Sequence, residues 1–191
     1  MKKQILKYLP RVIFIIFLLS FSFLFYYSSP EKLIGWIGVQ NSYLLIFILA
    51  FIGGLSTFSG VPYHLVLITL ASGGANPLLL GTVTAVGVMI GDSTSYLLGY
   101  EGSEIIPARV QSIMEKIFAF GQKHPTALPV FFFLYGALTP FSNDFLVIPA
   151  GLAKYPFKKI MIPLALGNMV FNILLAYSGS YAYRALQGIF F

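Results

Sequence analysis

The chain has 191 residues, of which 58% are hydrophobic and only 9% are charged, and its mean hydropathy is +0.84. Soluble domains carry about 25% charged residues, so this composition is typical of an integral membrane protein. The chain contains no cysteine, which excludes disulfides, thiol catalysis and cysteine-ligated metals. Its net charge of +6 does not indicate a nucleic-acid interface, because the basic residues flank apolar runs and form no single stripe.

The N-terminal part, residues 1–34, is predicted to be a transmembrane helix followed by a linker. Four basic residues precede an apolar run over 12–29, which would be about 27 Å long as a helix and just able to cross a bilayer. The basic residues are expected to stay cytoplasmic. A cleaved signal peptide is the alternative, although Ser28, Ser29 and Pro30 do not form a good small-residue cleavage site.

The next segments predict a helical hairpin. Residues 30–40 form either a short interfacial helix, with Trp36 at headgroup level, or a loop. The apolar run 42–54 is too short to span comfortably, and it leads into a break marked by Ser59, Gly60 and Pro62 before a second apolar run, 65–71. A re-entrant hairpin explains this pattern, and one full crossing through 42–71 is the alternative.

Residues 78–100 predict a cleaner crossing, which carries Asp92 among small residues that let another helix approach closely. Residues 101–124 are the one polar segment. Apolar residues recur there at helical spacing, so we expect an amphipathic helix on the membrane surface.

A second broken run covers 126–152, with its break at Thr139, Pro140 and Ser142. Pro140 cannot continue a helix, and Asp144 is a carboxylate in otherwise lipid-compatible sequence. Broken backbone at membrane depth is tolerated only where it is buried in protein or lines a wet cavity. We therefore expect a second re-entrant hairpin here. A last crossing over 160–183 follows, interrupted by polar residues that include Asn168, and then a short tail, 186–191.

The two halves of the chain resemble one another. The runs 65–68 and 145–148 are similar, each is followed by a proline-marked turn, and Gly91-Asp92 matches Gly167-Asn168 in the crossing that comes next. Repeat 1 covers about 35–100 and repeat 2 about 101–185. By the positive-inside rule, basic residues collect on the cytoplasmic side of a membrane. The topology that places ten of the twelve basic residues on that side gives the two hairpins opposite orientations. The predicted fold is an all-α polytopic membrane protein with an inverted repeat of two opposed re-entrant helical hairpins plus transmembrane helices.

The ionisable residues predicted near mid-membrane are Asp92, Asp144 and His64, with Asn143 and Asn168 as further polar contacts. A carboxyl group in a low-dielectric site holds a proton more readily, so either acid could carry protons. Each residue also has a structural interpretation. Asp144 would cap the short helix that starts at Phe145, and Asp92 would be a buried, neutral acid held by hydrogen bonds. His64 would be a hydrogen-bonded polar residue at the start of a helix. Asn168 would form a hydrogen bond between two helices.

Three motifs in this order resemble the DedA family, the SNARE-associated or VTT domain, over about residues 35–185. They are Ser59-Gly60-Val61-Pro62, the run from Gly91 to Tyr96 with Gly99, and Pro140 followed by Pro149-Ala150-Gly151-Leu152. The resemblance implies two opposed hairpins and the movement of lipids or lipid phosphates between leaflets. The sequence departs from the pattern of bacterial members. These usually have a glutamate just after the proline of the first hairpin, where His64 is nearby, and two arginines around the proline of the second, where Ala137 and Asn143 stand. Because arginines clamp phosphates, this argues against a polyprenyl-phosphate substrate.

The resulting functional hypothesis is a flippase or scramblase without cofactor, metal or nucleic acid, in the cell membrane. Its expected partners are membrane lipids, among them anionic lipid phosphates, with protons or Na+ as coupling ions and a homo-oligomer as one arrangement. A structural or assembly module without transport is the alternative. An intramembrane hydrolase is weaker, because only Asp92 lies on a crossing helix and the pair Ser59 and His64 lacks a nucleophile motif.

Overall fold

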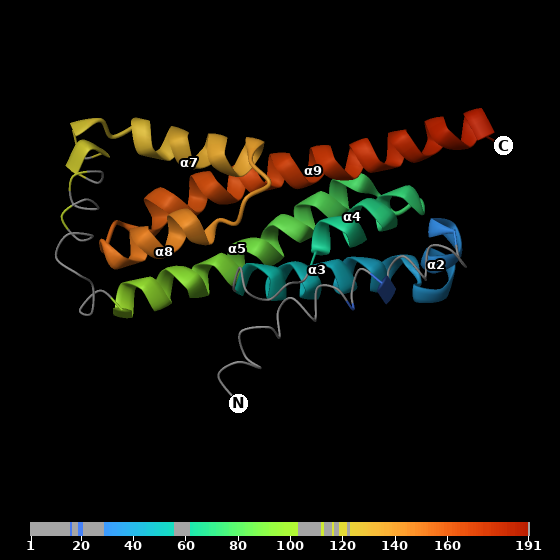
Figure 1. The fold of residues 1–191 in the computed structure, drawn as a ribbon, viewed down its shortest axis with the longest axis horizontal. Coiled ribbons are helices and arrows are strands. Elements are labelled where there is room, and N and C mark those ends of the chain that lie inside the picture. The colour runs from blue at the N-terminus through green and yellow to red at the C-terminus, as the bar shows by residue number, and fades with distance from the viewer. Residues whose placement is uncertain are drawn as a thin grey trace.

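The computed structural model describes residues 29–55, 62–102 and 123–190, with separate positions at 16, 19–20, 112, 116 and 119–121. These residues form a helical bundle without strands (Figure 1). The predicted N-terminal helix 12–29 and the amphipathic segment 101–124 lie largely outside the described residues. The helices are α2 (Pro30–Ile37), α3 (Val39–Leu55), α4 (Tyr63–Ser72), α5 (Pro77–Glu101), α7 (Ala127–Leu138), α8 (Asp144–Leu152) and α9 (Phe157–Phe190).

The segment 30–37 is a helix, not a loop. Ser29 caps it by accepting a hydrogen bond from the backbone N–H of Lys32, and Pro30 occupies its first turn, where a missing N–H costs nothing. Gly38 ends it at a φ of 84°, which glycine adopts readily. The axis bends by 97° between α2 and α3, and Trp36 is exposed. The placement of α2 at a membrane surface stays a prediction.

Helices α3 and α4 form the first hairpin. At its open end the Tyr43 hydroxyl accepts a hydrogen bond from the Asn76 backbone N–H at 3.1 Å. At its other end the Tyr63 ring lies against Gly53, where an added Cβ would come within 2.6 Å of it. The chain therefore turns back between these helices, and a single crossing through 42–71 is wrong. Pro62 directly precedes α4, whereas Ser59 and Gly60 lie outside the described residues.

Helices α7 and α8 form the second broken element, around residues 139–143. Both the N–H and the hydroxyl of Thr139 donate to the Tyr135 carbonyl, so α7 closes there. Pro140 follows, and the Tyr135 hydroxyl donates across the break to the Ser142 carbonyl at 3.0 Å. Figure 1 shows α8 returning in the direction opposite to α7. The re-entry of either hairpin into a membrane stays a prediction.

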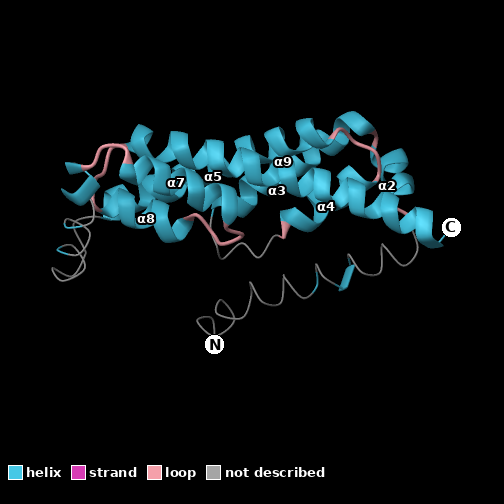
Figure 2. Ribbon diagram, turned by 90° about the horizontal axis from the view of Figure 1, so that it is seen from above, coloured by secondary structure: helices cyan, strands magenta, loops and turns pink. Residues whose placement is uncertain are grey.

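The long helices α5 and α9 run antiparallel through the bundle, and both are long and apolar enough to cross a membrane (Figure 1). Helix α9 extends from Phe157 to Phe190, so residues 186–190 continue the last helix and are not a separate tail. In two perpendicular views the break after α7 and the start of α4 lie near the middle of the long axis (Figure 1, Figure 2).

Each long helix packs against one short helix of its own repeat and one short helix of the other repeat. Helix α3 packs on α5 and α7 on α9, whereas α4 packs on α9 and α8 on α5. Glycine permits the closest approaches. A Cβ on Gly87 of α5 would lie 2.7 Å from the Phe47 carbonyl oxygen, and one on Gly167 of α9 would collide with the Phe133 carbonyl oxygen. The repeats therefore interlock, and neither long helix is covered by its own repeat alone.

The ends of α4 and α8 show that α4 and α5 are related to α8 and α9 by a shift of 80 residues. Gly74 has a φ of 100° and Lys154, 80 positions later, a φ of 53°. At both ends the N–H of the following residue donates to the carbonyl five positions earlier, at 3.2 and 3.0 Å. The contacts between repeats obey the same shift, because Gly99 lies against Ile148 and Gly179 lies against Ile68. An approximate two-fold axis therefore relates the halves.

This relation corrects the predicted alignment of the repeats. With the shift of 80, Gly87 is equivalent to Gly167, and Asp92 is equivalent to Asn172 and not to Asn168. The sequence alignment of the crossing helices was wrong by four residues. Because four residues are close to one helical turn, the shifted alignment still superposes small and polar residues on the same helix face.

Two apolar clusters, one at each end of the bundle, make up the core. Equivalent positions occupy both clusters, as with Leu67 and Val147 or Leu80 and Ile160, all fully buried. Asp92, Asn143 and Asp144 are buried as well and belong to neither cluster.

Candidate functional site

Buried polar side chains come from three elements of the bundle. They are Asp92 of α5, Asn143 and Asp144 at the start of α8, and Asn168 and Asn172 of α9, each less than 10% exposed. Four of these five were predicted as site residues from the sequence. The fifth, Asn172, is another polar residue within the last predicted crossing and was not among the predicted site residues. Its signal was its position 80 residues after Asp92.

Asn143 and Asp92 are directly bonded. The Asn143 amide donates to the Asp92 carboxyl oxygen at 2.7 Å, in buried surroundings. Asn143 occupies the N-cap position of α8, yet its side chain caps no backbone N–H there. The helix begins one residue earlier than expected, because Asp144 is already the first residue of α8, and its backbone N–H donates to the Ser142 hydroxyl. The cap position is thus used to join the second hairpin to α5.

The end of the first hairpin reaches the same part of α5. The hydroxyl of Ser95, one turn beyond Asp92, donates to the carbonyl of Leu55, the last residue of α3, at 3.3 Å. Gly91, next to Asp92, meets Gly54 so closely that an added Cβ would lie 2.5 Å from its carbonyl carbon. The turn that carries Asp92 therefore lies between the end of α3 and the start of α8.

His64 occupies the position in α4 that corresponds to Asp144 in α8. Its ring centre lies 4.1 Å from that of Tyr63, and it meets Phe171 of α9 edge to face at 5.6 Å. These contacts place His64 against α9, whereas Asn143 is the residue that bonds to Asp92. The described residues bring together no group of three histidine, aspartate or glutamate side chains that would hold a metal ion.

The amides of α9 are less completely paired. Asn172 donates to the Asn168 backbone carbonyl at 2.8 Å. Among the described residues no partner is found for the Asn172 oxygen Oδ1 or for the Asn168 nitrogen Nδ2, although both atoms are buried. Asn168 therefore does not form the bond between helices that its polar side chain suggested.

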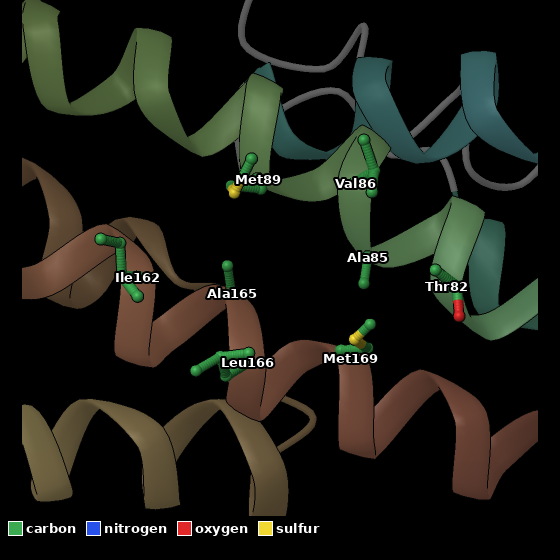
Figure 3. A pocket seen from close by; sticks show the side chains of 8 residues that line it. All are labelled: Thr82, Ala85, Val86, Met89, Ile162, Ala165, Leu166 and Met169. Carbon is green, nitrogen blue, oxygen red and sulfur yellow. The ribbon is translucent and has the colours of Figure 1, made fainter. Parts of the chain in front are cut away.

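An apolar groove of about 250 Å³ lies between α5 and α9. It is lined by Thr82, Ala85, Val86, Met89, Ile162, Ala165, Leu166 and Met169 (Figure 3). Each of the four residues from α5 has its counterpart 80 positions later among the four from α9, so the approximate two-fold axis passes through the groove. The Thr82 hydroxyl donates to its own helix at the Leu78 carbonyl, so the groove offers little to a polar ligand. It is separate from the Asp92 site.

A family model for the VTT domain matches residues 61–181. No curated protein and no solved structure matches the chain. The match begins at the end of the first hairpin's break, includes Asp92, Asn143 and Asn172, and covers more than half of the chain. Together with the apolar helices, the two candidate spans and the paired hairpins, it identifies the protein as an integral membrane protein of the VTT domain family.

Proposed function

We propose that this protein moves a lipid headgroup between the two leaflets of a membrane, along a polar path past Asp92. The observation that carries the proposal is the 2.7 Å hydrogen bond between Asn143 and Asp92. It joins a backbone break to a buried acid in the middle of a long apolar helix. Broken backbone and ionisable residues at such a depth are costly in lipid and are found where they line a path through the protein.

The arrangement of the repeats supports the same function. Inverted repeats with broken helices meeting near the midplane are a recurrent plan of transporters. Because the two hairpins approach from opposite ends of the bundle (Figure 1), the path would be equally open to both leaflets. A headgroup could then pass through the centre while its acyl chains stay in lipid.

The charges of the site restrict the headgroup. Asp92 and Asp144 are both carboxyl groups, and Asp144 lies at the start of α8, where a helix dipole favours negative charge. An anionic phosphate would therefore enter only with protons on the acids or with a cation beside it. Proton-linked movement of lipid phosphates, or movement of zwitterionic phospholipids, fits this chemistry, and Na+ could replace the proton.

We propose transport and not hydrolysis. A pair of catalytic acids on crossing helices would need a carboxyl group on α9 as well as Asp92 on α5, and α9 contains no aspartate or glutamate. Ser59, the other candidate nucleophile, lies outside the described residues, and His64 packs against aromatic rings.

Reconstitution in vesicles with a leaflet-accessibility assay tests the proposal. Asp92→Asn keeps an oxygen that accepts from Asn143 but cannot ionise, so the protein should fold while lipid movement falls and loses its dependence on pH. Thr82→Val is the matched control on the same helix, because the Thr82 hydroxyl bonds only to its own backbone. A folded wild-type protein that moves no lipid would indicate a structural or assembly module instead.

A further inference from the structure

Asn172 is the counterpart of Asp92 under the two-fold relation between the repeats. The contacts of Gly99 with Ile148 and of Gly179 with Ile68 give this register, and the helix ends at Gly74 and Lys154 agree with it. Asn172 is 1% exposed and Asp92 is 3% exposed. The buried polar side chains therefore form two groups, an acidic half that includes Asp92 on α5 and an amide half on α9.

The amide half leaves hydrogen-bonding capacity that the described residues do not fill. Nδ2 of Asn172 donates to the Asn168 backbone carbonyl, which fixes the orientation of this amide and leaves Oδ1 as a buried acceptor. Nδ2 of Asn168 is a buried donor. The two side chains are four residues apart and so lie on one face of α9. A hydroxyl group, which donates and accepts at once, has the matching chemistry.

We propose that Asn168 and Asn172 form a hydroxyl-binding site, the second half of the polar path. The site deepens the proposed function and rests on it. Its ligand is either a water molecule that wets the path for any headgroup or the hydroxyl of a headgroup in transit. The site differs in kind from the Asp92 half, because it binds without charge and without taking up protons.

The test compares Asn172→Leu with Asn172→Asp in vesicles. Leucine matches asparagine in size but removes the acceptor, whereas aspartate retains it. We expect Asn172→Leu to slow lipid movement by about tenfold or more, as the loss of one hydrogen bond to a buried group would, and Asn172→Asp to stay closer to wild type. Thermal unfolding in detergent should show that Asn172→Leu is folded with a stability close to that of wild type, because the one protein partner of the Asn172 side chain is a backbone carbonyl of its own helix. If Asn172→Leu does not fold, Asn168→Leu replaces it.

Two lipids distinguish the sources of the hydroxyl. Phosphatidylglycerol has headgroup hydroxyls and phosphatidylcholine has none. If Asn172→Leu slows the movement of phosphatidylglycerol alone, the ligand is the headgroup hydroxyl. If it slows the movement of both lipids, the ligand is water. Wild-type rates for both lipids in a folded Asn172→Leu variant would overturn the site but leave the transport function intact. A wild-type protein that moves neither lipid would overturn the proposed function itself.

Discussion

At the scale of single residues, Asn76 and Asn143 show how one local signal can serve two purposes. Both occupy the position before the first turn of a helix. Asn76 caps α5 by accepting from the next two backbone N–H groups that it can reach, at 3.0 and 3.2 Å. Asn143 instead donates its amide to Asp92. A cap residue that leaves its own helix to bond with a buried acid holds two elements together.

The Asn143→Ala substitution should reveal this difference. It removes a donor from a buried carboxyl group, which costs about 1–3 kcal/mol, and the cost should shrink in an Asp92→Ala background because the partner is gone. Asn76→Ala should cost about 1 kcal/mol as the loss of a cap, in either background. Unfolding by denaturant in detergent micelles measures both. An equal cost of Asn143→Ala in the two backgrounds would show that the bond with Asp92 is not what stabilises the hairpin.

Glu31 should make the attachment of α2 to α9 dependent on pH. Its carboxylate accepts from the Tyr183 hydroxyl at 3.1 Å and from Gln187 at 3.2 Å. Burial disfavours the charge, but hydrogen bonds from its own backbone N–H, Ser29, Tyr183 and Gln187 outweigh it and hold the pKa of Glu31 below its ordinary value of 4.5. This stabilisation is therefore complete above pH 4.5 and is lost as the pH falls through the lower pKa of the folded state.

The fluorescence of Trp36, the single tryptophan of the chain and a residue of α2, reports on this attachment. An acid transition is expected in the wild type and should be absent in Glu31→Gln, which cannot titrate. The same transition in both proteins would exclude Glu31 as its source.

At the scale of helices, backbone contact at glycine explains why the short helices lie so close to α5 and α9. A Cβ at Gly87 or Gly167 would press on a carbonyl oxygen of the facing helix, and backbone cannot move aside as a flexible side chain can. Gly35 of α2 has nothing within 4 Å of the same position. Gly87 and Gly167 are therefore required by close backbone packing, whereas packing places no such requirement on Gly35.

Gly167→Ala and Gly87→Ala should each destabilise the protein by about 1–3 kcal/mol through overpacking. Gly35→Ala should stabilise α2 by about 0.5–1 kcal/mol, because alanine is the better helix former. Thermal unfolding in one detergent ranks the three variants. If Gly167→Ala unfolds at the wild-type temperature, α7 and α9 do not depend on this contact.

At the scale of the whole molecule, the two-fold relation and the distribution of lysines predict opposite orientations for the repeats. Lys32 on α2 and Lys158 at the start of α9 are both exposed, and the positive-inside count places them on opposite sides of the membrane. Cysteines introduced in this cysteine-free chain as Lys32→Cys and Lys158→Cys should react with an impermeant thiol reagent from opposite sides. Labelling of both from one side would contradict the inverted arrangement.

The sequence alone determined what depends on composition and on local backbone chemistry. The low charge indicated a membrane protein, Pro140 placed the second break, and the apolar runs placed both hairpins and both crossings. Polar residues in apolar runs identified Asp92, Asn143, Asp144 and Asn168 as candidates, and all four are buried.

Only the tertiary structure decided which of these residues meet. The rotation of each helix and its depth beside its neighbour select a contact, and a shift by one turn leaves the local pattern almost unchanged. The sequence therefore misaligned the crossing helices by four residues and passed over Asn172, which the packing of Gly99 and Gly179 identifies as the counterpart of Asp92. Packing likewise turned Asn143 from its own helix to Asp92, because a bond between distant segments exists only once the bundle has brought them together.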